Sequence, residues 1–198
     1  MHLIAIAVLL LTGGAPAPGK CPPLSPRIAS VRELTNDELI AALRPGPFEP
    51  AGTPGTWVDR VTLAVKEVER RGETMIPLLA SLKGCRETFF GGGLGNPMSA
   101  FEIPAQDTAT GQKAIPLEQA AIYMIVGIYR GSFAHAQSPY LVDLRIPSGK
   151  RPASVSPQLD ERAWRSVDRW LTQWRASNLA ELRRRKQDPL AGSQLAFW

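Results

Sequence analysis

The segment LEQAAIYMIVGIYRG, which follows Pro116, constrains the fold more than any other part of the chain. From Ala120 to Tyr129 every residue except Gly127 is apolar or aromatic. A helix that is apolar on all sides is usually buried on all sides. This one is too short to span a bilayer, which takes about 20 residues. The segment therefore predicts a central core helix that the rest of the chain has to cover.

Other segments carry helical signals and can supply this cover. Thr35 precedes Glu38 by three residues, which is the spacing of a capping box at a helix start. Further along, apolar residues recur at 3.6-residue spacing, for example Val61, Ala64 and Val65, and again around the tryptophans of the last third of the chain. Helices are predicted over about 36–43, 57–71, 75–83 and 157–186.

Between residues 86 and 115 the helical period is lost. Two short apolar groups, Phe101–Ile103 and Ala114–Ile115, are separated by polar turn residues and predict a small β-hairpin. The stretch YLVDLRI, residues 140–146, predicts a further strand. The expected fold is mainly α: a compact helical domain of about five helices with a small β-hairpin insert.

The N-terminus has the pattern of a secretory signal peptide, predicted over residues 1–19. An unbroken apolar run from Leu3 to Leu11 is followed by small residues, which is typical of the hydrophobic region and the cleavage site. We expect a periplasmic or secreted protein exported by a bacterial cell. A lipid anchor at Cys21 and a buried N-terminal helix are the alternatives.

Three segments follow this predicted leader. Residues 20–55 are a Pro-rich segment with one short helix, and residues 56–187 form the helical domain. Residues 188–198 are expected to be a C-terminal tail that frays unless Phe197 and Trp198 dock on the core.

The chain has two cysteines, Cys21 and Cys85. An even number in an exported chain predicts a disulfide bond. Closing a loop of about 65 residues would stabilise the fold by roughly 4 kcal/mol in the chain-entropy model. Two unpaired thiols are the alternative.

The stretch FFGGGLGNP, residues 89–97, invites comparison with phosphate-binding loops. No Lys-Ser or Lys-Thr follows the glycines, as a P-loop requires. Pro97 disfavours a helix directly after them. We interpret glycines 91–95 as a turn or bulge and expect no cofactor.

The residues offer little for catalysis. His135 is the only histidine outside the predicted leader, which argues against a metal site built on several histidines. Ser132 lies three residues before it, without the G-x-S-x-G of a nucleophile elbow. Paired carboxylates remain an alternative, because a glycosidase needs only two. Asp107, Glu118 and Asp143 are isolated in sequence, so no pair among them can be assigned.

The net charge of +5 is concentrated near the C-terminus. Residues 145–188 hold eleven lysines and arginines against five acidic residues. We expect an interaction surface at Arg183, Arg184, Arg185 and Lys186, with weak attraction to anionic envelope polymers. The nearby tryptophans follow the apolar stripe, so we expect them to pack inward and expect no nucleic-acid partner.

Two helical segments resemble the helices of a HEAT-type repeat. Pro77, Leu78, Leu79 and Leu82 match the first helix, and Ala120, Ala121, Ile125 and Gly127 match the second. The resemblance implies a helical scaffold for protein interactions. The residues thus favour an exported, non-catalytic protein-binding module, an envelope adaptor or an inhibitor or immunity-type protein. The alternative is an envelope hydrolase that uses paired carboxylates on an anionic or glycan substrate.

Overall fold

The computed structural model describes residues 31–43, 56–90, 114–136, 138–150 and 155–198. These residues form six α-helices, three short 3-10 helices and two antiparallel strand pairs. The predicted class, mainly α with a small β element, is confirmed. No helix in these five ranges is long and apolar enough to cross a membrane. The predicted signal peptide, Cys21 and glycines 91–95 lie outside the described residues.

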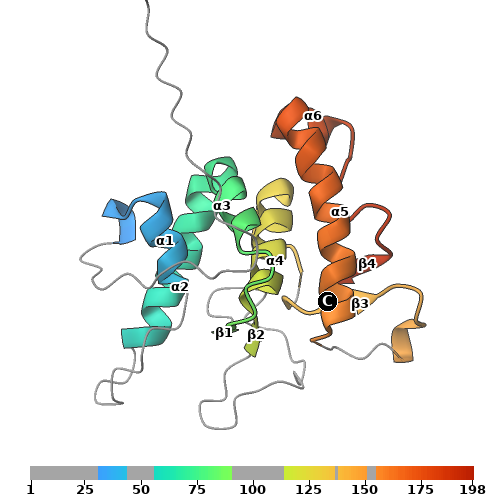
Figure 1. Cartoon of the computed structure of the whole chain (residues 1–198), viewed down its shortest axis with the longest axis horizontal. Helices are drawn as coiled ribbons and strands as arrows, with labels where there is room; N and C mark the ends of the chain where they lie inside the picture. The colour runs from blue at the N-terminus through green and yellow to red at the C-terminus, as the bar shows by residue number, and fades with distance from the viewer. Residues whose placement is uncertain (1–30, 44–55, 91–113, 137, 151–154) are drawn as a thin grey trace, which may run out of the picture.

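Helix α4 (Leu117–Arg130) is the central element, as its all-round apolar sequence predicts. Every residue from Leu117 to Tyr129 is buried. The helix begins after Pro116, and Gly131 ends it in the left-handed conformation, with φ of 84°. In Figure 1, α4 lies in the middle of the molecule, with α1 to α3 on one side and α5 and α6 on the other.

The N-terminal side comprises η1 (Val31–Glu33), α1 (Asn36–Ala42), α2 (Thr56–Arg71), η2 (Gly72–Met75) and α3 (Ile76–Ser81). The predicted capping box is confirmed: the backbone N–H of Glu38 donates to Thr35 Oγ1, and the N–H of Thr35 donates to a Glu38 carboxylate oxygen. At the end of α2, Arg71 donates from Nη2 to the carbonyl oxygen of Leu34 at 2.6 Å. The start of α1 is thereby fixed to the end of α2.

The C-terminal side differs from its prediction. Instead of one helix over 157–186, the chain forms α5 (Pro157–Ala176) and α6 (Leu179–Arg184). Asn178 causes the break, because its backbone is extended and its side chain accepts the N–H of Glu181 at 2.9 Å. An Asn cap that starts a new helix competes with continuation of the old one. The three-residue spacing of Asn178 and Glu181 is a helix-capping signal in the sequence. The prediction followed the apolar stripe instead.

The strand pairs also differ in part from their prediction. Strand β2 (Ala114–Pro116) pairs with β1 (Thr88–Phe90), with Phe89 opposite Ile115. The predicted partner, 101–103, lies outside the described residues. The pairing with β1 is favoured by burial, since Phe89 and Ile115 both enter the core.

The predicted strand in YLVDLRI is confirmed as β3 (Leu141–Asp143), which precedes η3 (Ser148–Lys150). It pairs with β4 (Leu195–Phe197) from the C-terminal tail. The ring of Phe197 packs edge-on against Tyr123 of α4, with centroids 4.9 Å apart. The end of the chain therefore docks on the core.

Candidate functional site

The structure gives the four predicted basic residues different roles. Arg183 donates from Nε and Nη2 to the carbonyl oxygens of Tyr129 and Ile128, both at 2.6 Å. These carbonyls belong to the last turn of α4, so Arg183 acts as a C-terminal cap for the core helix. Arg183 thus supports the core helix, and the residue is also exposed on the surface.

The other three predicted residues are exposed as well. Arg184 and Arg185 both pair with Glu181 on the surface of α6. The side chain of Lys186 forms no hydrogen bond and no ion pair with another residue of the described ranges. Its backbone adopts a φ of 55°, which ends α6 and turns the chain back toward the core.

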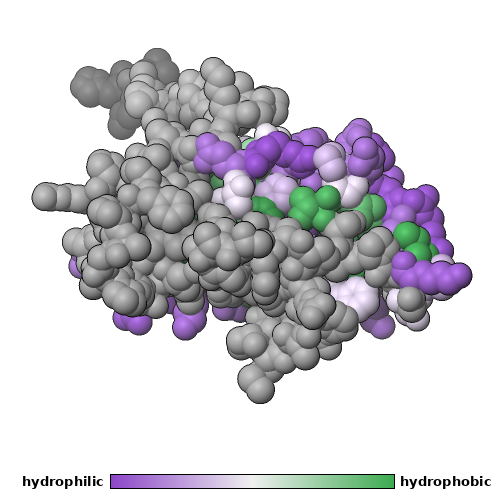
Figure 2. Space-filling view, turned by 90° about the horizontal axis from the view of Figure 1, so that it is seen from below, coloured by the Kyte–Doolittle hydropathy of each residue, from purple (hydrophilic) through white to green (hydrophobic). Residues whose placement is uncertain are grey.

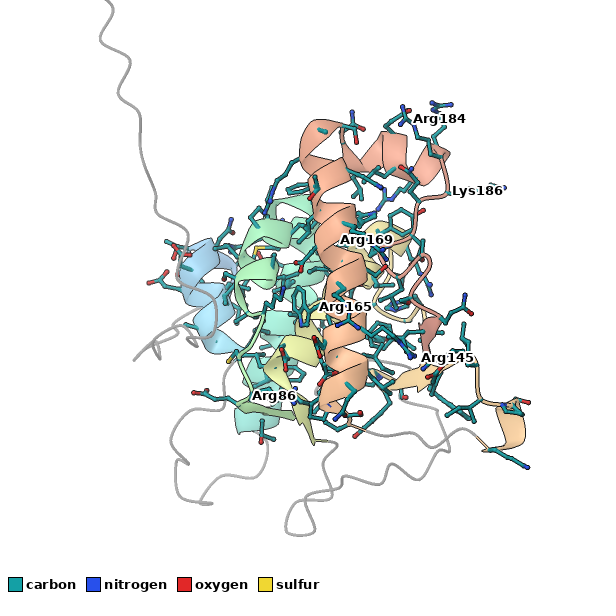
Figure 3. All side chains as sticks on the ribbon, turned by 45° about the vertical axis from the view of Figure 1, so that its right-hand side comes forward. Arg86, Arg145, Arg165, Arg169, Arg184 and Lys186 are labelled. Atoms are coloured by element: carbon teal, nitrogen blue, oxygen red, sulfur yellow. The ribbon has the colours of Figure 1, made fainter. Side chains whose placement is uncertain are left out.

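Helix α5 adds cations to this surface that the prediction did not include. Arg165 is 61% exposed and pairs only with Glu161, and Arg169 is exposed with no side-chain partner among the described residues. Figure 3 shows Arg165 and Arg169 along α5, with Arg184 and Lys186 beyond them near α6. We call the following five side chains the basic strip: Arg165, Arg169, Arg184, Arg185 and Lys186.

A buried pair of carboxylates lies at the other end of α5. Glu118 is in the first turn of α4 and Asp160 in the first turn of α5, and their exposed fractions are 6% and 1%. Arg86, which follows α3, donates from Nη1 to Asp160 Oδ2 at 2.8 Å and also to Glu118 Oε1. The backbone N–H of Gly84 donates to Glu118 Oε2 at 2.9 Å. The cluster joins the turn after α3 to the starts of α4 and α5.

Within this cluster, Asp160 has a raised pKa. Burial raises its pKa from 3.8 to about 6, and the nearby charge of Glu118 acts in the same direction, while Arg86 opposes both. Asp160 Oδ1 is buried without a hydrogen-bond partner in the described structure, and so is Trp164 Nε1 one helical turn later. Burial of a carboxylate oxygen without a hydrogen-bond partner disfavours the charged form of Asp160.

This pair is buried, whereas the two carboxyl groups of a glycosidase are open to the substrate. In such enzymes the two carboxyl groups flank the substrate, about 5–5.5 Å or 6.5–9.5 Å apart. Here Nη1 of Arg86 bonds to both carboxyl groups. Sequence reasoning named Glu118 as a candidate but missed Asp160. Their ion pairs with Arg86 connect elements of the fold.

The remaining acidic candidates are also bound internally. Asp143 pairs with Arg145 at 2.6 Å and Arg162 at 2.8 Å, and these hydrogen bonds, led by the one from Arg145, hold its pKa below its usual range. Glu67 accepts from Arg70 and Arg71, and the Arg70 bond is the main reason that its pKa falls to about 2. Asp107 lies outside the described residues.

His135 does not form a catalytic pair with Ser132. Its Nδ1 lies 3.1 Å from the backbone carbonyl oxygen of Ser132, whereas the Ser132 hydroxyl accepts the N–H of Ala134. The His135 ring packs against Tyr123 with centroids 4.3 Å apart. Burial is the main cause that lowers its pKa to about 4, so the ring is neutral at pH 7. His135 therefore packs at the edge of the core.

No metal site is evident within the ranges described, where no group of three or more His, Cys, Asp or Glu side chains is placed to hold an ion. Cys85 is 1% exposed, directly before Arg86. Its predicted partner, Cys21, lies outside the described residues, so their disulfide stays a prediction.

Comparisons of the chain with protein-family models, with curated proteins and with solved structures each found no match. The HEAT-type resemblance stays a prediction carried by the residues of α3 and α4. These two helices do pack against each other.

Proposed function

We propose that this chain is an exported, non-catalytic protein-binding module of the cell envelope, of the adaptor or inhibitor and immunity kind. The observation that carries the proposal is the contrast between buried and exposed charge. The buried carboxylates Glu118, Asp160 and Asp143 accept hydrogen bonds from arginines of the same chain. The basic strip, in contrast, presents cations to solvent.

The surface composition supports a polar rather than an apolar contact. Where the structure describes the side chains, three large hydrophobic residues are exposed: Leu63, Leu144 and Val155. Figure 2 shows a described surface that is mainly hydrophilic, with small hydrophobic areas between. Single exposed hydrophobic residues are normal for a soluble protein. Charged side chains are thus the main feature that a partner can recognise.

Capture from cell-envelope extract tests this proposal. The protein lacking residues 1–19 is immobilised, and bound proteins are eluted with salt and identified by mass spectrometry. We expect one or a few envelope proteins to be enriched over a control column that carries an unrelated basic protein. Recovery of no partner, together with degradation of peptidoglycan by the purified protein, would overturn the proposal.

The envelope hydrolase is the second candidate, because Glu118 and Asp160 meet at the starts of two helices and Asp160 has a raised pKa. Its test is release of soluble fragments from peptidoglycan by the wild type, E118Q and D160N. Activity that both variants lose while their circular dichroism spectra stay native would favour the hydrolase. We expect no release by any of the three proteins.

A further inference from the structure

The basic strip occupies the side of α5 that faces away from the core. Ala163, Trp164 and Val167 are buried and mark the inner side of the helix. At 100° per residue, Arg165 and Arg169 lie within about 40° of each other and roughly opposite that inner side. The two guanidinium groups therefore project outward from successive turns, as Figure 3 shows for the labelled pair.

These cations are available for a new partner. Arg169 has no competing side-chain partner in the described structure, and the ion pair of Arg165 with Glu161 is solvent-exposed on both sides. Exposed ion pairs contribute little to stability because water screens them. A carboxylate of a partner can therefore replace Glu161 beside Arg165 at little cost in free energy. The same holds for Glu181 beside Arg184, because Arg184 is 72% exposed.

Several observations favour a protein partner over a membrane or a polyanion. The exposed hydrophobic residues Leu63, Leu144 and Val155 lie outside the strip, so the strip has no apolar anchor for insertion into lipid. Glu161 and Glu181 alternate with the cations of the strip, a pattern that matches separate carboxylates better than a uniformly negative polymer. An arginine guanidinium also forms two parallel hydrogen bonds with a carboxylate, which gives directional recognition of Asp and Glu.

We propose that the basic strip docks an acidic α-helix of the partner protein, an inference that rests on the proposed function. Arg165 and Arg169 are four residues apart, which is about 6.0 Å along the helix axis. A partner helix laid along α5 presents carboxylates at i and i+4 with the same repeat. Arg184, Arg185 and Lys186 extend the contact beyond α5.

The test uses a charge-reversal pair and a matched control on the same helix. The double variant R165E/R169E reverses the outward cations of α5. The control R175E changes an arginine that is exposed, also has no side-chain partner in the described residues, and lies on a different side of α5. Thermal unfolding and circular dichroism of all three proteins establish that each variant remains folded.

The probe is a synthetic helical peptide with glutamates at i and i+4 along one face. The comparison peptide has the same composition, with the glutamates distributed around the helix. Affinities are measured by fluorescence anisotropy. We expect R165E/R169E to weaken binding of the first peptide by about tenfold or more and R175E by less than about twofold. Binding should also weaken as salt rises from about 50 mM to about 500 mM, because exposed charges are screened.

Three results would overturn the inference: no binding of the first peptide, equal binding of the two peptides, or an equal loss in R175E. Tighter binding of polyphosphate or of phosphatidylglycerol vesicles than of the first peptide would assign the strip to a polyanion or a membrane. The capture experiment separates the two proposals. A partner that R165E/R169E captures as well as the wild type does leaves the proposed function standing and refutes the docking site. Absence of any captured protein, together with degradation of peptidoglycan by the purified protein, refutes the proposed function itself.

Discussion

The raised pKa of Asp160 predicts a measurable effect of replacing this residue with asparagine. In the folded protein the buried carboxyl binds its proton more tightly than in the unfolded chain, since its pKa is about 6 instead of 3.8. Its stabilising contribution is therefore fully present below about pH 4 and is lost as the pH rises through about 6. The neutral amide that D160N introduces resembles the protonated carboxyl at every pH. The variant should consequently gain stability over the wild type as the pH increases.

The magnitude follows from the size of the shift. A pKa of about 6 in the folded protein, against 3.8 in the unfolded chain, corresponds to about 3 kcal/mol. About 2 kcal/mol of this falls between about pH 4.5 and 7.5, because part of the titration of the unfolded chain is complete at the lower limit. Asp160 is 1% exposed, so solvent screening does not reduce this value greatly.

The pH dependence of the wild-type free energy of unfolding does not by itself reveal the contribution of Asp160. Burial lowers the pKa of His135 from 6.5 to about 4, so the unfolded chain binds more protons there and stability increases with pH over the same range. Asp160 and His135 thus act in opposite directions. The difference between D160N and the wild type isolates the carboxyl, because His135 is present in both.

Urea unfolding at about pH 4.5 and 7.5 measures this difference as a change in the free energy of unfolding. We expect D160N to gain about 2 kcal/mol relative to the wild type between the two pH values. E161Q is the control, since Glu161 is exposed, pairs only with Arg165 and should not change the pH dependence. If the difference between D160N and the wild type is the same at both pH values, Arg86 and not burial governs Asp160, and the reasoning is wrong.

Three further outcomes are expected. G127A should lose about 1–2 kcal/mol in urea unfolding, because the new Cβ would lie 2.4 Å from Phe133 Cδ1 and this overpacking outweighs the helix-propensity gain; equal or higher stability would contradict the packing described. R183M keeps the aliphatic stem but removes the cap of α4, and should cost about 1–2 kcal/mol, whereas the surface variant R184M should leave the midpoint unchanged; equal losses would contradict the capping role. A thiol reagent applied to the native exported protein should modify neither Cys21 nor Cys85, and modification of both would refute the predicted disulfide.

The helices of this protein could be predicted where local signals are strong. The all-round apolar segment identified α4 as the core helix, and the capping box at Thr35 identified the start of α1. The break between α5 and α6 was missed because the prediction followed the apolar stripe and did not consider Asn178 as a cap. The backbone turns there because the Asn178 side chain caps α6. Hydrophobic periodicity does not reveal this local hydrogen bond.

The candidate site, like the helices, could be predicted from the sequence only in part. The sequence by itself determined that the C-terminal third is basic and that the chain has few residues suited to metal or histidine chemistry. Only the tertiary structure decided that Arg183 caps α4, that the exposed strip extends along α5, and that Glu118 meets Asp160 across Arg86. The reason is physical: charge and periodicity are properties of local sequence, whereas ion pairing and the burial that shifts a pKa depend on which distant segments pack together.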